Sequence, residues 1–458
     1  MIRQRMKVRG IRRRRGLREA LAGTAAFCAV AALPGQALAA GTPSPYVFDT
    51  AAKPVKGAAS TADAPALSAG ATYKDSIKPK GKQYYRLDLD ARTNAYVSAV
   101  AVPKLGTKVG LGDEIKVSVL DRDSSSCDSG DDVAFGSAEY PRPLSTYGAR
   151  LIEQGASNCQ EAGTYYVLVE RDTAATSTPE DWDLEIRYQS EPGLKSAGPT
   201  AAPSVWPSTS PAPPAGGPRK RAGGTGFNDA TGLTTGEWTD EIKSGESRFY
   251  RVPVDWGQQI FSDVDLHSAT GDKTGFVGSA LAYTLYNPAR GFVQSGDSVS
   301  YDGKQKTAAM DPLPPVTYEN RFDSSSGEKD MQLAGWYYLR LTLSPQVGQI
   351  FGNTAYGVTL RVTVKGAAKQ TGPDYAGTTS DFKVSEGDQE AAANGQSGPQ
   401  AKQSGAMKTL AAAGIGAGTV LVLGLGVWTL VARRRAADGR PSAPEQRQTQ
   451  EYGPPSAW

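Results

Sequence analysis

Residues 68–90, SAGATYKDSIKPKGKQYYRLDLD, decide the fold because their pattern returns in residues 234–255, TTGEWTDEIKSGESRFYRVPVD. A second stretch, QEAGTYY at 160–166, returns as QLAGWYY at 332–338. Matching positions tie the first two stretches together: Gly70 and Gly236, Ile77 and Ile242, Tyr85-Arg86 and Tyr250-Arg251. Self-similarity at a spacing of about 165–172 residues indicates two copies of one domain.

Apolar and polar side chains alternate throughout both copies, which is the pattern of half-buried β-strands. Polar residues such as Asp183, Glu185 and Arg187 take the face opposite the apolar one. Tyr96 to Val102 forms a further extended run. Several strands with one apolar face each predict all-β sandwiches. The apolar stripes are Tyr85, Leu87 and Leu89; Ile115, Val117 and Val119; Tyr165, Val167 and Val169; Trp182, Leu184, Ile186 and Tyr188; Leu281, Tyr283 and Leu285; and Tyr356, Val358, Leu360, Val362 and Val364.

Composition divides the exterior of the chain into two domains and three connecting segments. We expect the β-sandwich domains at 66–189 and 225–365. A Pro-, Ala-, Gly- and Ser-rich linker at 190–224 separates them and is expected to be a semi-extended spacer. Low apolar content predicts a flexible N-terminal segment at 40–65 and a flexible stalk at 366–406.

The N-terminus has the three parts of a secretory signal peptide. Nine basic side chains lie within residues 1–18, an apolar stretch follows to about Leu33, and Ala37-Leu38-Ala39 is a small-x-small cleavage signal. We therefore predict that residues 1–39 are removed after export. An uncleaved anchor is the alternative, but the apolar stretch is short for a crossing.

A second apolar segment lies near the C-terminus. Residues 407–431, MKTLAAAGIGAGTVLVLGLGVWTLV, carry one charge, Lys408, and predict a transmembrane helix over 407–432. The basic cluster Arg433, Arg434 and Arg435 follows and predicts that residues 433–458 form a cytoplasmic tail. The sequence thus predicts a single-pass type I protein of the cell membrane, with its N-terminus outside.

The net charge of +3 conceals an acidic exterior. Residues 1–39 carry nine basic and one acidic side chain, and residues 433–458 carry five basic and three acidic ones, which leaves −7 for residues 40–432. The basic balance belongs to targeting and topology, so we expect no nucleic-acid partner.

Two cysteines, Cys127 and Cys159, remain after the leader with Cys28 is removed. An even pair in an exported chain predicts one disulfide, which lies only in the first copy. Two cysteines without a nearby histidine do not complete a zinc site.

The repeated unit resembles the bacterial pre-peptidase C-terminal domain. The resemblance rests on an early strand, Tyr84 to Leu89 and Phe249 to Val254, and on a late turn and strand, Ala162 to Val167 and Ala334 to Leu339. It implies jelly-roll-like sandwiches that act as accessory domains of secreted hydrolases, bind polymeric substrate and in some members hold calcium. This chain differs in having no peptidase domain. Its Arg-rich leader and Ala/Gly/Pro-rich linkers resemble those of actinobacterial surface proteins.

Residues for catalysis are scarce. The chain has one histidine, His267, at the end of a predicted strand, and it has no G-x-S-x-G motif. We therefore expect no enzyme and no cofactor other than calcium. Five aspartates in one loop are calcium candidates, with a solvated acidic loop as the alternative: Asp121, Asp123, Asp128, Asp131 and Asp132.

Four aromatic residues lie off the apolar stripes and are candidates for a binding face, with packing under loops or against the other domain as the alternative: Tyr84, Tyr166, Trp336 and Tyr338. The sequence predicts a non-enzymatic surface binding or scaffolding protein whose partner is an envelope polymer or an extracellular protein. The alternative is an accessory subunit that presents substrate to a separate secreted peptidase or assembles with a secretion component.

Overall fold

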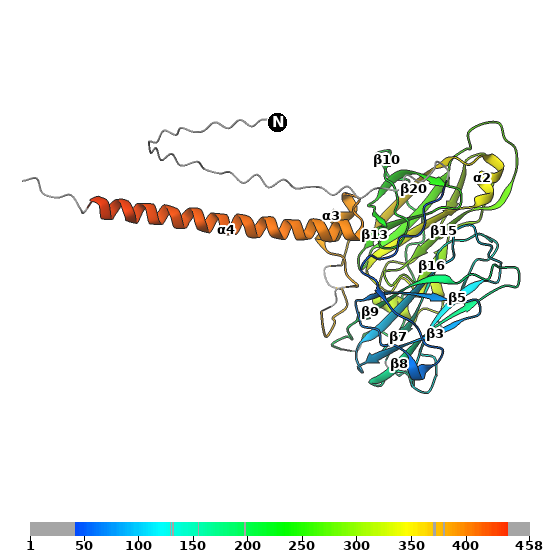
Figure 1. The fold of residues 1–458 in the computed structure, drawn as a ribbon, viewed down its shortest axis with the longest axis horizontal. Coiled ribbons are helices and arrows are strands. Elements are labelled where there is room, and N and C mark those ends of the chain that lie inside the picture. The colour runs from blue at the N-terminus through cyan, green and yellow to red at the C-terminus, as the bar shows by residue number, and fades with distance from the viewer. Residues whose placement is uncertain are drawn as a thin grey trace, which may run out of the picture. The chain divides into compact units, whose positions relative to one another are not determined.

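The computed structural model describes residues 42–437 except 129, 131, 154, 197, 370–371 and 379–380. The predicted signal peptide and residues 438–458 of the predicted tail lie outside the described residues. β-Strands dominate the described part (Figure 1). The prediction of all-β sandwiches is confirmed.

The first sandwich consists of two sheets. Neighbouring strands within each sheet are antiparallel, except that the edge strand β1 is parallel to β2. One sheet has the order β1-β2-β9-β4-β7, and the other has the order β3-β8-β5-β6. This order is that of a double-sheet jelly roll. The strands are β1 (Lys53–Pro54), β2 (Thr72–Ile77), β3 (Lys82–Leu89), β4 (Asn94–Val102), β5 (Glu114–Leu120), β6 (Val133–Ala134), β7 (Leu144–Arg150), β8 (Gly163–Asp172) and β9 (Trp182–Glu191), with the 3-10 turn η1 at Thr61–Asp63.

The second sandwich repeats this order, with sheets β10-β12-β20-β14-β18 and β11-β13-β19-β15-β16, and with β17 also paired to β15. Its elements are β10 (Pro218–Lys220), β11 (Thr231–Gly232), β12 (Gly236–Lys243), β13 (Ser247–Val254), β14 (Gln259–Leu266), β15 (Val277–Tyr286), β16 (Phe292–Ser295), β17 (Val299–Tyr301), β18 (Lys306–Ala309), η2 (Tyr318–Phe322), α1 (Ser326–Lys329), β19 (Gly335–Leu343), α2 (Pro345–Phe351) and β20 (Ala355–Lys365).

One polar contact recurs in both copies at the position that the sequence repeat marks. The Tyr85 hydroxyl donates to Asp75 Oδ2 at 2.7 Å, and the Tyr250 hydroxyl donates to Asp240 Oδ2 at 2.7 Å. Each carboxylate also accepts a backbone N–H from the segment that enters the sandwich: Asp75 from Gly57 at 2.7 Å, and Asp240 from Gly223 at 2.8 Å. The repeat is therefore a repeat of structure as well as of sequence.

Each sandwich has its own apolar core, and the stripes predicted from the sequence fill these cores. The opposite face of β9 was expected to be the less buried face of a half-buried strand. The structure corrects this expectation, because Glu185 and Glu191 are fully buried at the junction with the second sandwich. Arg290 and Arg321 of that sandwich pair with Glu185 and Glu191. Ion pairing makes it possible to bury these carboxylates.

Smaller apolar clusters complete the junction between the sandwiches. Val100 on β4 packs with Phe249 on β13 and Tyr286 on β15. Tyr147 on β7 donates a hydrogen bond to Asp330 Oδ1 at 2.5 Å. The sheet containing β9 and β4 is thus covered on both of its faces.

The connecting segments also differ from the expectation of flexibility. In the N-terminal segment, Tyr46 and the backbone of Asp49 hydrogen-bond to Glu185 at 3.3 and 2.7 Å. In the predicted stalk, Phe382 is fully buried and the Tyr375 hydroxyl donates to Glu191 at 2.6 Å. A few aromatic residues in an otherwise polar segment are enough to hold it on the sandwiches. The average composition of a segment does not reveal single residues such as Tyr375 and Phe382 that attach it to the sandwiches.

The linker likewise packs rather than acting as a free spacer. Its last part forms β10, which pairs with β12. The Pro207 carbonyl accepts a hydrogen bond from Gln259 Nε2 at 2.7 Å. Arg219 stacks over the Trp238 ring with 4.1 Å between guanidinium and ring centroid.

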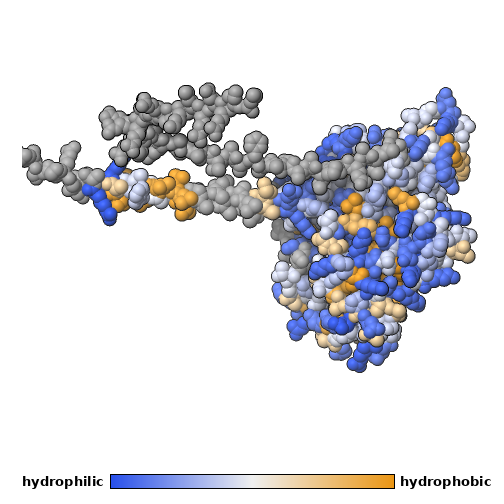
Figure 2. Space-filling model, in the orientation of Figure 1, coloured by the Kyte–Doolittle hydropathy of each residue, from blue (hydrophilic) through white to orange (hydrophobic). Residues whose placement is uncertain are grey.

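Helix α3 (Glu386–Ala393) begins at a capping box in which Ser385 and Asp388 exchange hydrogen bonds, and α4 follows at Gly398–Ala437. The predicted membrane segment lies in α4, and the side chains of 408–418 are outside the described set. The described apolar side chains at its far end are exposed, for example Trp428 at 68% (Figure 2). Among the described residues, no helix combines the length and apolar character needed to cross a membrane. The predicted crossing stays a prediction.

Candidate functional site

Two adjoining hollows form what we call the linker groove. Their volumes are about 240 and 600 Å3, and they share five lining residues: Leu194, Ser196, Gly198, Pro199 and Tyr318. The larger hollow also touches Arg92 and Glu153 of the first sandwich and Phe322 of the second. The groove therefore exists only where both sandwiches and the linker meet.

Backbone pairing fixes one wall of the groove. Leu194 of the linker forms an antiparallel bridge with Tyr375. The Lys195 N–H donates to the Asp374 carbonyl at 2.8 Å, and the Ala376 N–H donates to the Gly193 carbonyl at 2.7 Å. The Lys195 ammonium also pairs with the Asp374 carboxylate at 2.7 Å. The linker, expected to be a semi-extended spacer, and the segment 373–376 of the expected flexible stalk therefore hold each other in place.

Tyr318 is the aromatic residue that lines both hollows, and contacts of Asn320 and Arg321 fix its position. It begins η2, where Asn320 Nδ2 donates to the carbonyls of Pro315 and Met331, each at 2.9 Å. The Arg321 guanidinium lies 3.3 Å from the centroid of the Tyr318 ring, a cation–π contact. Burial raises the pKa of the Tyr318 hydroxyl above its ordinary value, although Arg321 acts in the opposite direction. The hydroxyl is therefore neutral, and the Asn94 side chain hydrogen-bonds to it.

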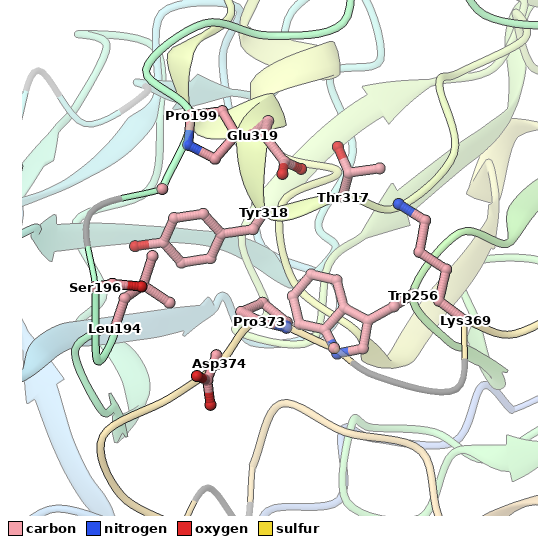
Figure 3. A pocket seen from close by; sticks show the side chains of 12 residues that line it. Leu194, Ser196, Pro199, Trp256, Thr317, Tyr318, Glu319, Lys369, Pro373 and Asp374 are labelled. Carbon is pink, nitrogen blue, oxygen red and sulfur yellow. The ribbon is translucent and has the colours of Figure 1, made fainter.

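Trp256 lines the smaller hollow next to Tyr318 (Figure 3). Its backbone N–H donates to Asp255 Oδ1 at 2.8 Å, and its carbonyl accepts from Lys369 N–H at 2.8 Å. A Cβ on Gly372 would come within 2.5 Å of the Trp256 indole nitrogen, so only glycine fits against this ring. Trp256 is buried, with 6% of its surface exposed, and lines the smaller hollow.

Polar groups surround the two rings. Glu319 and Thr317 lie on the η2 side, and Lys369 lies beyond Trp256 (Figure 3). Fixed aromatic rings with a few polar groups around them are suited to binding sugar rings or peptide groups. His267 lies at the end of β14, where its Nε2 is 2.8 Å from Thr359 Oγ1, and it does not line either hollow.

A buried charge cluster lies at the junction beside the groove. The Glu191 carboxylate pairs with Arg321 and accepts from Asn94 Nδ2 at 2.7 Å and from the hydroxyls of Tyr96 and Tyr375 at 2.9 and 2.6 Å. Burial first, and the carboxylate second, raise the pKa of Tyr96 and of Tyr375. One carboxylate thus connects β4, β9, η2 and the segment that carries Asp374.

The structure does not bring the predicted aromatic candidates into one binding face. Tyr84 and Tyr166 are half-buried on neighbouring strands β3 and β8. The Trp336 indole N–H donates to Asp388 Oδ1 at 2.9 Å under the Arg251 guanidinium. Tyr338 packs edge-on against Phe227 at 5.1 Å. For Trp336 and Tyr338, packing against other segments is what the structure shows.

The disulfide between Cys127 and Cys159 is confirmed. The predicted calcium candidates spread out instead of converging, and Asp131 lies outside the described residues. Asp121 accepts the backbone N–H groups of Asp123 and Ser125, Asp128 pairs with Lys329 at 3.6 Å, and Asp132 pairs with Lys116 at 3.0 Å. Within the described ranges, no group of three or more acidic, histidine or cysteine ligands is placed to hold a metal.

The sequence analysis missed Trp256, Tyr318 and the linker residues of the groove. Trp256 and Tyr318 lie outside the alternating strands, and connecting segments often carry binding residues. The linker residues carry no such signal, because their role depends on the segment 373–376 that lies beside them.

No protein-family model matches the chain, and no curated protein matches it. The similar solved structures include the CBM22-1-CBM22-2 tandem domain of Paenibacillus barcinonensis Xyn10C, at 11% identity and a TM-score of 0.17, over 65% of this chain and 86% of that one. The CUB1-EGF-CUB2 domain of human MASP-1/3 matches at 7% identity and a TM-score of 0.15, over 64% and 99%. The infectious bursal disease virus Gx strain structure matches at 9% and 0.22, over 66% and 72%. Scores this low identify neither a family nor a ligand.

Proposed function

We propose that this chain is an exported, membrane-anchored binding protein without catalysis of its own, and that its linker groove takes a segment of an envelope polysaccharide. The observation that carries the proposal is the groove itself. It joins two hollows of about 240 and 600 Å3 around the fixed rings of Tyr318 and Trp256. Two connected hollows suit an extended polymer better than a single small molecule.

The chemistry of the lining supports a glycan. Aromatic faces and edges contact the apolar C–H surface of a sugar, and neighbouring hydroxyl, carboxylate and ammonium groups hydrogen-bond its hydroxyls. Tyr318, Thr317, Glu319 and Lys369 supply these groups. The chain's only histidine is elsewhere, which supports binding without acid–base chemistry by histidine.

The proposal includes a C-terminal membrane anchor. It rests on residues 407–431, whose apolar length matches a bilayer, and on the basic cluster Arg433 to Arg435 that follows. The exposed apolar side chains of α4 from Val420 to Val431 add support, because such a surface needs an apolar environment. The signal peptide predicted at 1–39 supports export.

The resemblance to pre-peptidase C-terminal domains supports a role in holding polymer for other envelope proteins. The repeated jelly-roll order of both sandwiches agrees with that resemblance. We propose that the chain itself presents the polymer, and that any hydrolysis belongs to a separate protein.

The test is co-sedimentation of the full chain, solubilised in detergent, with purified insoluble cell-wall polysaccharides. We expect Tyr318→Ala to lower affinity roughly tenfold, because a fixed aromatic contact is worth about 1 kcal/mol or more. Tyr318→Phe, which keeps the ring, should retain most of the binding. Phe276→Ala, which removes an exposed aromatic side chain that lines neither hollow, is the matched control and should bind as the wild type does.

Two outcomes would contradict the proposal. Equal sedimentation of the wild type and Tyr318→Ala would remove the groove from binding. Recovery of a stoichiometric protease or secretion component after crosslinking in intact cells, with no polysaccharide bound, would favour the accessory-subunit function instead.

A further inference from the structure

A second cavity lies between the sandwiches, away from the linker groove, and two buried arginines line it. Its volume is about 270 Å3, and we call it the arginine pocket. Arg142 comes from the segment before β7, and Arg340 comes from the middle of β19. Only 7% and 3% of these residues are exposed.

Neither guanidinium has a carboxylate partner among the described residues. Arg142 donates to the carbonyls of Phe135, Ala138 and Tyr140. Arg340 donates to the Pro143 carbonyl and to Thr284 Oγ1. By contrast, the buried Arg290 and Arg321 at the same junction each form an ion pair with a buried glutamate, Glu185 and Glu191 respectively. Two positive charges are therefore buried here with only neutral acceptors.

Each arginine also keeps a donor without a partner in the described structure. The Nε–H groups of both Arg142 and Arg340 are buried and make no hydrogen bond. Burial and, after it, repulsion by Arg340 lower the pKa of Arg142 to about 10. A buried cation without a counter-charge is costly, and an anion that enters the cavity would relieve this cost.

We propose that the arginine pocket binds an oxyanion, a phosphate or carboxylate group carried on a small organic unit such as an acidic sugar. Guanidinium groups recognise both anions through paired N–H donors. The hydroxyl of Thr284 and those of Ser137 and Ser279 also line the cavity and supply further hydrogen bonds. A volume of about 270 Å3 is several times the share of about 30 Å3 that one water has in the liquid, so the cavity admits more than a bare ion.

One negative charge opposes binding. Asp297 lines the exposed side of the cavity, and its Oδ2 accepts a weak hydrogen bond from Ala309 N–H at 3.4 Å. Its carboxylate selects against highly charged anions. Asp297→Asn should therefore tighten oxyanion binding by a few-fold, as removal of an exposed like charge does.

The experiment measures calorimetric binding and thermal melting of the full chain in detergent with three probes: inorganic phosphate, glycerol phosphate and glucuronate. Sodium chloride at matched ionic strength corrects for general salt effects. We expect at least the two organic probes to bind and to raise the melting temperature. Arg142→Gln and Arg340→Gln should each weaken binding by about 10- to 100-fold, since each removes a charged hydrogen-bond donor.

Control variants separate a binding role from a structural one. Arg86→Gln removes an exposed arginine on β3 and should bind as the wild type does. Arg340→Lys keeps the charge and should retain part of the affinity while losing the paired geometry. Binding of all three probes identifies the oxyanion itself as the ligand, and binding of the organic two alone identifies its carrier as well.

The proposal is overturned if none of the three probes binds, or if binding survives in both Arg142→Gln and Arg340→Gln. In either case the two arginines serve only to hold backbone carbonyls. Tyr318 does not line the arginine pocket, so a negative result with these probes does not bear on the proposal that the linker groove binds polysaccharide.

Discussion

The two sandwiches share one strand order but hold the segments that follow the matching strands β5 and β15 in different ways. In the second sandwich this segment forms β16 and β17, and both pair with β15. In the first sandwich the corresponding segment pairs with β5 through a single bridge between Leu120 and Ser126 and through the two-residue strand β6. It also carries Cys127, which is linked to Cys159. The comparison teaches that the disulfide adds to a backbone pairing that is shorter in the first copy than in the second.

In the sheet that contains β5 or β15, the side at β3 in the first copy and at β13 in the second is held in the same way in both copies. Tyr85 with Asp75 and Tyr250 with Asp240 fix the entering chain at the same position and at the same distance of 2.7 Å. The copies therefore share the tyrosine–aspartate contact and differ in the disulfide. Between them lies the buried junction of Glu185 and Glu191 with Arg290 and Arg321.

The largest effect should come from removing the junction that holds the copies together. Glu191→Ala leaves Arg321 buried without its partner, so we expect a loss of about 3–5 kcal/mol in the free energy of unfolding. Urea denaturation measures this loss. Glu170→Ala, which breaks an exposed pair with Lys82, is the control and should cost no more than about 1 kcal/mol. Equal effects of the two substitutions would show that the junction does not stabilise the protein.

The next effect tests the difference between the copies. Replacing Cys127 and Cys159 together by alanine opens a crosslink with a sequence separation of 32, and this should cost about 3–4 kcal/mol. Hydrogen exchange should rise first in residues 121–160, while β16 and β17 keep their protection. Faster exchange in β16 and β17 as well would contradict the view that backbone pairing secures the second copy by itself.

The smallest effect tests the tyrosine–aspartate hydrogen bond that both copies contain. Tyr85→Phe and Tyr250→Phe each remove one hydroxyl from a carboxylate, and each should cost about 1–3 kcal/mol. Because the geometry is the same, the two losses should be similar when measured by urea denaturation. A loss in only one copy would mean that the repeated contact has kept its energetic role in one sandwich alone.

The strands could be predicted from the sequence because alternation in residues such as Tyr85, Leu87 and Leu89 reports local burial directly. The disulfide could be predicted because only two cysteines remain after the leader. Glu185 and Glu191 could not be placed, since alternation shows that they leave the core of their own sandwich but does not show that a second sandwich covers them. The groove was missed for the same reason: Leu194 and Tyr318 are 124 positions apart in the sequence, and only the packed junction brings them together.

Scanning calorimetry of the full chain in detergent tests the central claim most directly, namely that the two sandwiches form one body whose junction builds the linker groove. The account predicts a single unfolding transition that contains both sandwiches in the wild type. Two well-separated transitions in the wild type would contradict it, because sandwiches that unfold independently would not hold the walls of the groove together.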